Sequence, residues 1–292
     1  MLYFFSEVKY NKDILIQIRK ERSKMKKVLA LALIVALSVV AVFGLAACNN
    51  KEDWEYIEKK GEMVIGYTVF NPMNYEEDGE LVGFDTELAK AVCAELGVEA
   101  KFQVIDWNSK FTELNSKNID AIWNGFTVTQ KRRYSTDFTY SYLKNKQIAV
   151  VKAENAAIYT TIASMADAKL VAEEGSAGES AIQADATLKN ADYTAIGTQT
   201  NALLEVKAGT SDIAFVDSVM AEGTLAAGGD YSGLVIVEGI SLVEEEYAIG
   251  LRRGSSKTLE KIDIALKALY ADGTIAALAA KYNLTESLLP IA

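Results

Sequence analysis

Short runs of apolar residues alternate along this chain with longer segments in which apolar residues recur every three or four positions. Between two such runs, every fourth residue from Phe84 to Leu96 is apolar, which predicts a helix that Asp85 caps and Gly97 ends. Buried strands are predicted at residues 63–68, 101–105, 119–123 and 147–152. This alternation is typical of an α/β fold with a largely parallel sheet.

The same alternation starts again in the second half of the chain. Strands are predicted at residues 169–172, 193–196, 213–217 and 234–238. Leu114 lies six residues before Asp120, as Val206 lies six before Asp212, and an apolar strand follows in both segments. The echo would also fit coincidence. If it reflects two similar units, the carboxyl ends of their strands would meet at one cleft, where ligands bind in open α/β sheets.

The first 47 residues have a different character. Lys26 and Lys27 precede an uncharged run from Val28 to Ala47, which is long enough to span a bilayer as a helix. A secretory signal peptide has the same plan, and Leu45-Ala46-Ala47-Cys48 resembles the box at which bacterial lipoproteins are cleaved and lipidated. We therefore expect an upstream extension at 1–24, a lipoprotein signal peptide at 25–47, lipid on Cys48 and a tether at 48–56.

Composition excludes several kinds of site. The chain has no histidine, which rules out imidazole metal sites, Ser-His-Asp triads and Cys-His dyads. Cys48 and Cys93 are the two cysteines, so no disulfide framework is indicated, and Cys93 beside the apolar helical stripe is predicted to be a packed thiol. From Cys48 onward 22 basic and 37 acidic residues leave a net charge of −15, which repels nucleic acid. We expect no metal, no cofactor and no nucleic-acid partner.

The richest stretch of candidate chemistry runs from Asp120 to Arg133. Its apolar strand ends at Asn124-Gly125, Thr127 and Thr129 alternate with apolar residues, and two arginines follow. Hydroxyls, the N–H groups of a turn and a guanidinium suit a small carboxylate, because arginine presents a planar fork that binds it with two hydrogen bonds. By itself the stretch would also fit a strand that ends in a turn with a solvated basic patch.

Two loops add further candidates. Pro72 fixes the loop at 70–75 and would pose Phe70 over a pocket, although a core position for Phe70 fits equally well. The turn Gly175-Ser176-Ala177-Gly178 joins a predicted strand to a predicted helix and would leave backbone N–H groups free for an anion. Many strand-to-helix turns share this composition, so the second signal is weak alone.

Taken together, these segments resemble the bilobed solute-binding proteins of bacterial ABC importers, specifically the amino-acid-binding family, over about residues 60–285. The matching segments are residues 83–89, 119–122, Thr127-Val128-Thr129 with Arg132, Gly175-Ser176, 212–217 and 247–250. The resemblance implies a type II periplasmic-binding-protein fold, a two-lobed clamshell in which each lobe has a mostly parallel sheet flanked by helices. Lobe 1 would comprise 57–144 and 249–292, lobe 2 would comprise 150–243, and hinge strands would lie near 145–149 and 244–248.

The resemblance also implies which residues bind the carboxylate of an amino acid. Arg132, in a Thr-x-x-Arg segment, would hold the α-carboxylate, and Thr127 would donate its hydroxyl to the same group. The turn at Ser176, Ala177 and Gly178 would add backbone N–H groups. Arg133, one position on, is expected to face elsewhere.

Other residues would bind the rest of such a ligand. Asn124 and Gly125 would accept hydrogen bonds from the α-ammonium group, and Asp217 would balance its charge. Phe70 and Trp107 would form walls around the side chain. A zwitterion taken out of water needs charged partners of this kind, because unpaired buried charges are costly.

Two positions depart from the family pattern and leave the ligand's side chain open. Tyr67 stands where an acidic residue is common, and Trp123-Asn124 replaces a more usual small pair. The implied function is capture of a free amino acid between two lobes and its delivery to an ABC importer. An enzyme on the same scaffold, for instance a dehydratase or a peptidoglycan-active relative, is the alternative, although no catalytic residue stands apart from the binding roles.

Location and partners follow from the same resemblance. We expect a monomer on the extracellular face of the cytoplasmic membrane, held there by lipid on Cys48 alone. Its partners would be a free amino acid and the permease subunits of the importer. A ligand-sensing receptor domain would require a spanning helix after the second lobe, and the sequence to Ala292 contains no such segment.

Overall fold

The computed structural model describes residues 53–226 and 231–291. The predicted extension, the signal peptide and Cys48 lie outside these residues. In the part of the chain that is described, no helix is both long and apolar enough to cross a membrane. The predicted tether at 48–56 needs a correction, because helix α2 (Asp53–Lys60) begins within it. The buried Asp53 carboxylate accepts a hydrogen bond from Arg252 Nε at 2.6 Å, so residues 53–56 belong to the folded unit.

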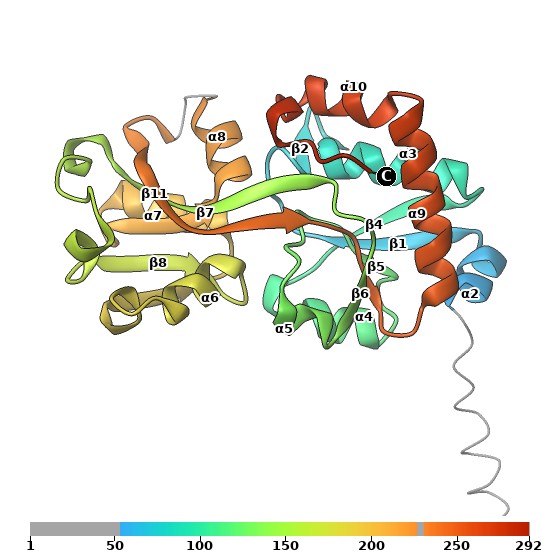
Figure 1. Ribbon diagram of the computed structural model, residues 1–292, viewed down its shortest axis with the longest axis horizontal. Helices are drawn as coiled ribbons and strands as arrows, with labels where there is room; N and C mark the ends of the chain where they lie inside the picture. Colours follow the sequence, from blue (N-terminus) through green and yellow to red (C-terminus); the bar gives the residue numbers. More distant parts are fainter. Residues whose placement is uncertain (1–52, 227–230, 292) are drawn as a thin grey trace, which may run out of the picture. The chain divides into compact units, whose positions relative to one another are not determined.

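The first sheet consists of β1 (Glu62–Tyr67), β4 (Glu99–Val104), β5 (Ala121–Ile122), β6 (Thr136–Phe138) and β12 (Gly250–Arg252). Its strand order is β4-β1-β5-β12-β6 (Figure 1). β1 runs parallel to both neighbours, whereas β12 is antiparallel to β5 and to β6. Four of the five strands therefore share one direction. A hairpin of β2 (Tyr75–Glu77) and β3 (Glu80–Val82) lies beside this sheet's helices.

The second sheet consists of β7 (Leu143–Lys152), β8 (Lys169–Glu173), β9 (Asp192–Ile196), β10 (Ile213–Asp217) and β11 (Leu234–Tyr247). Its order is β11-β7-β10-β8-β9, and β7 is antiparallel to both of its neighbours. Four strands again share one direction, so the prediction of largely parallel sheets is confirmed. We call the part built on the first sheet lobe 1 and the part built on the second sheet lobe 2.

Helices flank both sheets (Figure 1). They are α3 (Phe84–Glu95), α4 (Lys110–Asn115), α5 (Gln130–Arg133), α6 (Ala177–Ala184), α7 (Gln199–Ala208), α8 (Ser218–Ala226), α9 (Ser256–Ala271) and α10 (Thr274–Lys281). Short 3₁₀ turns lie at Trp107–Ser109, Ala153–Asn155, Ile162–Met165, Leu188–Asn190 and Thr285–Ser287. In α3 the predicted stripe of Phe84, Leu88 and Val92 is fully buried, and Cys93 is buried beside it as expected.

The predicted cap of α3 is wrong. Gly83, not Asp85, occupies the N-cap position, and its φ of 124° is one that residues with a Cβ rarely adopt. Asp85 lies inside the first turn with its side chain fully buried. Its carboxylate accepts hydrogen bonds from the Gly125 N–H at 2.7 Å and from the Tyr142 hydroxyl at 2.8 Å. The residue therefore connects α3 to the candidate site instead of ending the helix.

Two long strands carry the chain between the lobes (Figure 1). The chain passes from β6 in the first sheet into β7 in the second, and it returns from β11 to β12. β7 and β11 pair antiparallel along their length, from Lys152 opposite Leu234 to Leu143 opposite Tyr247. Two adjacent crossings of this kind allow rotation of one lobe against the other. The residue ranges given above for the lobes and hinge strands stay predictions.

The repeated sequence segment has a structural counterpart. Asp120 donates its backbone N–H to the Val64 carbonyl oxygen at 2.7 Å, and its carboxylate accepts from the Val64 N–H at 2.9 Å. Asp212 pairs with Lys169 in the same two ways, both at 2.8 Å. In each lobe an aspartate thus joins two neighbouring parallel strands, β5 to β1 and β10 to β8, at the point where they start to run side by side.

The predicted strand at 119–123 is shorter than expected. Only Ala121 and Ile122 form β5. The Ile119 carbonyl oxygen accepts from Arg252 Nη1 at 2.5 Å, a side-chain donor that takes the place of a strand partner. After Trp123 the chain leaves the strand at once, because Asn124 and Gly125 turn toward the cavity described below.

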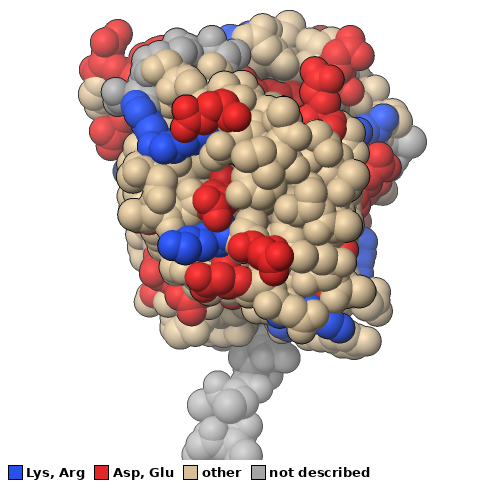
Figure 2. All heavy atoms as spheres, turned by 90° about the vertical axis from the view of Figure 1, so that its left-hand side faces the viewer, with Lys and Arg blue, Asp and Glu red and all other residues tan. Residues whose placement is uncertain are grey.

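Charged side chains are scattered over the face of lobe 2 that points away from lobe 1 (Figure 2). Acidic and basic residues are interspersed there beside a broad uncharged area, and this face carries no continuous basic surface. This face therefore offers no basic patch to which a polyanion such as nucleic acid would bind.

Candidate ligand-binding site

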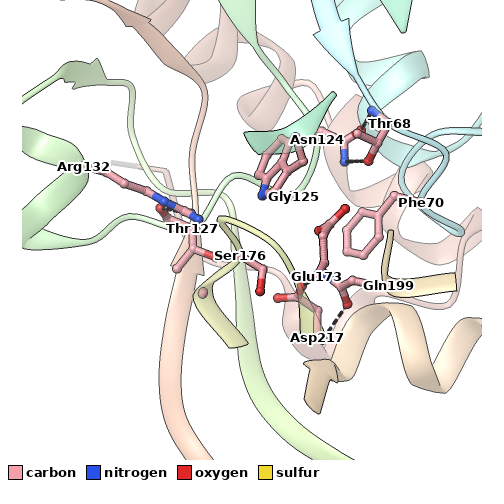
Figure 3. Close-up of a pocket in the computed structure, with 12 residues that line it drawn as sticks. Thr68, Phe70, Asn124, Gly125, Thr127, Arg132, Glu173, Ser176, Gln199 and Asp217 are labelled. Carbon is pink, nitrogen blue, oxygen red and sulfur yellow. Dashed lines mark hydrogen bonds between the residues drawn. The ribbon is translucent and has the colours of Figure 1, made fainter. Parts of the chain in front are cut away.

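A small cavity lies where residues of both lobes meet (Figure 3). The lining is mixed, with aromatic walls and several charged or amide side chains. The residues that line it are Thr68, Phe70, Trp107, Asn124, Gly125, Thr127, Arg132, Glu173, Ser176, Ala177, Gln199 and Asp217.

Arg132 is the cation of this cavity. Thr129 caps the short helix α5 by accepting from the Arg132 N–H at 3.1 Å, which aims the side chain inward. The guanidinium donates to the Thr127 carbonyl oxygen at 2.8 Å and lies over the Phe126 ring, with Cζ 4.7 Å from the ring centroid. Among the described residues no carboxylate pairs with it within 4 Å. Burial removes water from the Arg132 guanidinium and lowers its pKa. The site therefore holds a desolvated cation without an ion pair.

Lys110 places a second buried cation behind Arg132. Its ammonium donates to the carbonyl oxygens of Trp107 at 2.8 Å and of Gly175 at 3.0 Å, and Arg132 Nη2 approaches the same Gly175 oxygen at 3.4 Å. Burial, followed by the charge of Arg132, lowers the pKa of Lys110 to about 7. Both side chains thus reach from lobe 1 to one carbonyl of lobe 2.

Asp217 is the anion at the end of β10. Asn145 and Gln147 donate side-chain N–H groups to one of its oxygens, the latter at 2.7 Å, and Gln199 donates to the other. Gln199 also accepts from the Asp217 N–H at 2.9 Å, which fixes the amide beside the carboxylate. Burial raises the pKa of Asp217, while these hydrogen bonds and the charge of Arg132 act in the opposite direction. Among the described residues it has no ion-pair partner within 4 Å.

Glu245 joins the crossing strands to the site. It lies on β11, and one of its carboxylate oxygens accepts from Thr127 Oγ1 at 3.2 Å and from the amides of Asn145 and Gln147, each at 2.9 Å. Burial and the neighbouring Asp217 raise its pKa to about 7. Asn145 and Gln147 therefore bridge Glu245 and Asp217, so the crossing strands and the cavity share one polar network.

The lobe 1 wall is held rigidly. Asn124 and Thr68 bond to each other twice, through Thr68 N–H to Asn124 Oδ1 at 2.6 Å and Asn124 Nδ2 to Thr68 Oγ1 at 3.0 Å (Figure 3). Gly125 has φ of +54°, and a Cβ there would lie 2.6 Å from Phe70 Cε1. A glycine is therefore needed both for the backbone conformation and for the close approach of the Phe70 ring.

On the lobe 2 side the start of α6 faces the cavity. Ser176 caps the helix by accepting from the Glu179 N–H at 3.0 Å. The N–H groups of Ala177 and Gly178 belong to the first turn, which leaves them without partners inside the helix. Ser176 and Ala177 line the cavity, whereas Gly178 is not among the lining residues. A Cβ on Gly178 would lie 2.8 Å from Gln147 Oε1 and 3.0 Å from the Phe215 carbonyl oxygen, so this glycine lets α6 pack closely on β10.

Nine of the ten predicted ligand-binding residues line this one cavity, and Gly178 is the exception. Arg132 is buried and Arg133 is exposed, as expected for the two adjacent arginines. Three lining residues, Thr68, Glu173 and Gln199, were not predicted. Each lies at or next to the end of a strand or the start of a helix, and this position is the signal that would have found them.

Glu173 is the least expected of the three. It is the last residue of β8, its side chain is buried, and it points into the cavity (Figure 3). Burial, followed by the charge of Asp217, raises its pKa to about 8. Lys110, Arg132 and the Gln199 amide oppose this shift. In the described part of the chain, the cavity included, no group of three or more acidic or cysteine residues could hold a metal ion.

Known proteins resemble this chain over most of its length. The arginine-binding extracellular protein ArtP of Bacillus subtilis (strain 168) is 29% identical over 257 residues, which cover 86% of this chain and 96% of that protein. The histidine-binding periplasmic protein of Salmonella typhimurium is 31% identical over 221 residues, covering 74% of this chain and 84% of that protein.

Solved structures agree with these sequence relatives. An ABC uptake transporter substrate-binding protein from Streptococcus pneumoniae, solved with bound histidine, is 31% identical to this chain and superposes with a TM-score of 0.73. The match covers 80% of this chain and 97% of that one. The predicted two-lobed fold is thereby confirmed.

The sequence profile of bacterial extracellular solute-binding proteins, family 3, matches residues 63–285. This range contains every strand of both sheets after the start of β1, and all residues that line the cavity. The resemblance inferred from the sequence is confirmed: this chain belongs to the bacterial extracellular solute-binding proteins, family 3.

Proposed function

We propose that this protein captures a free amino acid between its two lobes and delivers it to an ABC importer. The observation that carries the proposal is the pairing of two unmatched charges in one small cavity. Arg132 comes from lobe 1 and Asp217 from lobe 2, both are buried, and neither has an ion-pair partner among the described residues. A zwitterion would supply an anion to the first and a cation to the second.

The carboxylate of the ligand would lie at the Arg132 side. Arg132 would bind it through its guanidinium fork, and the Thr127 hydroxyl would turn from Glu245 to donate to it. The N–H group of Ala177, at the start of α6, faces the same cavity and would add a donor whose helix dipole favours an anion.

The ammonium group would lie at the Asp217 side. Three amides already orient this carboxylate, so its negative charge would be held in place before the ligand arrives. Carbonyl oxygens of Asn124 or Gly125 would accept the remaining N–H groups, and Phe70 and Trp107 would enclose the ligand's side chain. The arginine- and histidine-binding relatives support an amino acid as the ligand class.

Calorimetric titration of the purified protein with each of the twenty standard amino acids tests the proposal. We expect saturable, one-to-one heat for at least one of them. Absence of binding by all twenty, with a folded protein confirmed by its thermal transition, would contradict it.

An enzyme on the same scaffold is the second candidate, and Glu173 is the observation that favours it. A carboxyl group whose pKa is raised to about 8 stays protonated at neutral pH and would serve as a general acid in the cavity. Mass spectrometry of each bound amino acid after prolonged incubation distinguishes the two functions. A binding protein returns its ligand unchanged, whereas an enzyme returns a product.

The location and partners form the last part of the proposal. Cleavage before Cys48 and lipid on its sulfur would tether the monomeric protein to the outer side of the cytoplasmic membrane, where permease subunits would receive the ligand. Mass spectrometry of membrane-extracted protein should detect a diacyl-modified Cys48. An intact chain beginning at Met1 or Met25 in the same fraction would contradict the anchor.

A further inference from the structure

Glu173 is an ionisable group that the binding of a simple zwitterion leaves unused. Its side chain is 4% exposed and lines the cavity from the end of β8, next to β10, the strand that carries Asp217. In the described part of the chain, no lysine or arginine nitrogen lies within 4 Å of its carboxylate. A buried carboxylate without an ion pair is costly and needs a reason.

A zwitterion satisfies Arg132 and Asp217 but gives Glu173 no partner. Burial raises the pKa of Glu173 to about 8, so at neutral pH its carboxyl group holds a proton, and the empty lining carries one positive charge on Arg132 and one negative charge on Asp217. If Glu173 lost that proton with a zwitterion bound, one negative charge would remain uncompensated in a desolvated space. A ligand with one additional positive charge would supply the missing partner and allow Glu173 to ionise.

Glu173 and Asp217 occupy different parts of the cavity. Gln199 acts on both carboxyl groups: its amide donates a hydrogen bond to Asp217, and the same amide opposes the rise in the pKa of Glu173. In Figure 3 the carboxyl group of Glu173 points away from Asp217, toward the part of the cavity where Phe70 lies. Phe70 and Trp107 line the cavity as well, and aromatic rings attract cations. The acid and the aromatic walls thus suit a cation beyond the α-ammonium group.

We infer that the ligand is an amino acid with a cationic side chain and that Glu173 supplies the counter-charge, which makes Glu173 the residue that determines specificity. The inference rests on the proposed function. In the empty cavity Glu173 holds a proton at neutral pH, and a cationic side chain would displace it. Binding of a cationic ligand would therefore release a proton, while binding of a neutral ligand would not.

Pairs of ligands that differ in side-chain charge test the inference. The probes are L-arginine against its neutral isostere L-citrulline, and L-ornithine against L-norvaline, titrated by calorimetry at pH 7. We expect the cationic member of at least one pair to bind at least about tenfold more tightly. In two buffers of different ionisation enthalpy, the heats should also reveal proton release with the cationic member alone.

Substitution then assigns the preference to the residue. Glu173→Gln should weaken binding of the cationic ligand about 10- to 100-fold and leave the neutral isostere within about threefold, so that the preference disappears. Glu154→Gln, which removes an exposed carboxylate from the same lobe, is the control and should leave both affinities unchanged. A melting temperature of Glu173→Gln at or above that of the wild type would show that the loss is not one of folding.

The other outcomes are decisive as well. If the wild type binds a neutral or acidic amino acid more tightly than any cationic one, the inference is wrong and the proposed function stands. If the wild type prefers the cation but Glu173→Gln keeps that preference, Glu173 is not its cause and the inference is also wrong. If no amino acid binds at all, the proposed function itself fails. The wild-type ligand pairs and proton release decide the matter even if the variant does not fold.

Discussion

Replacing Arg132 by alanine removes the guanidinium that we propose as the partner of the ligand's carboxylate. In the closed cavity that carboxylate would have the Thr127 hydroxyl and the Ala177 N–H as remaining donors, and the remaining cation, Lys110, is bonded to the backbone carbonyls of Trp107 and Gly175 outside the lining. Breaking a buried ion pair by removing one partner costs on the order of 3–5 kcal/mol. Each 1.4 kcal/mol or so is a factor of ten, so the dissociation constant should rise by roughly two to four orders of magnitude.

The same substitution should have little effect on the stability of the ligand-free protein. The variant loses a charge-assisted hydrogen bond to the Thr127 carbonyl oxygen at 2.8 Å, a contribution of about 1.5–3 kcal/mol. It also loses a buried cation without an ion pair, whose desolvation costs several kcal/mol. These terms oppose each other, so we expect the free energy of unfolding without ligand to stay within about 2 kcal/mol of the wild-type value, in either direction.

Arg133 is the matched control. It is adjacent in sequence and exposed, with its guanidinium 5.5 Å from the centroid of the Phe138 ring. Arg133→Ala removes the same charge and should cost at most about 1 kcal/mol, or less than about tenfold in affinity. Calorimetry on both folded variants, with urea unfolding of each, measures the two quantities. If Arg133→Ala is the damaging change, or if Arg132→Ala unfolds the ligand-free protein, the reasoning is refuted.

Four further predictions concern motion, pH, backbone and thiol chemistry. Saturating ligand should close the lobes and lower the radius of gyration measured by small-angle scattering; an unchanged curve would argue against a hinge. Burial raises the pKa of Asp85 from 3.8 to about 7, so the folded protein keeps a proton that the unfolded chain loses in this window. The free energy of unfolding should therefore fall as pH rises from about 4 to 7, and Asp85→Asn should flatten that slope in urea titrations. Gly125→Ala should weaken ligand binding about tenfold or more, because the new Cβ would displace Phe70. Gly79 also has a positive φ, of +80°, but has open space around it, so Gly79→Ala should leave the affinity unchanged. Burial raises the pKa of Cys93 to about 12, so a thiol reagent at pH 8 should modify it only after unfolding.

Local patterns were enough to predict most elements of this fold. The four-residue spacing from Phe84 to Leu96 and the apolar runs predicted which residues face a core. This works because the period with which side chains face one side of a helix or strand is set by local backbone geometry. The echo of Asp120 and Asp212 was visible in the sequence, but its cause is long-range, since each aspartate pairs with a distant strand, at Val64 in β1 and at Lys169 in β8. The prediction that Asp85 caps the helix was wrong because its carboxylate accepts a hydrogen bond from a residue far away in the sequence, the N–H of Gly125.

The candidate site divides in the same way. Arg132 and Ser176 were predictable from short segments, because a capped turn aims each of them. Glu173 and Gln199 have no such local signature, since a polar residue at the end of a strand or the start of a helix usually faces solvent. They became lining residues because the second lobe lies against the first.

By itself, then, the sequence determined the elements, their apolar faces and the short motifs, all of which depend on neighbours a few residues away. Which ionisable side chains become buried and desolvated was decided by the tertiary structure alone. Arg132, Glu173 and Asp217 come from separate elements, and their burial around one cavity follows from the contact of two lobes. The balance of charge in that space, on which we propose that the choice of ligand depends, is therefore a property of the folded chain.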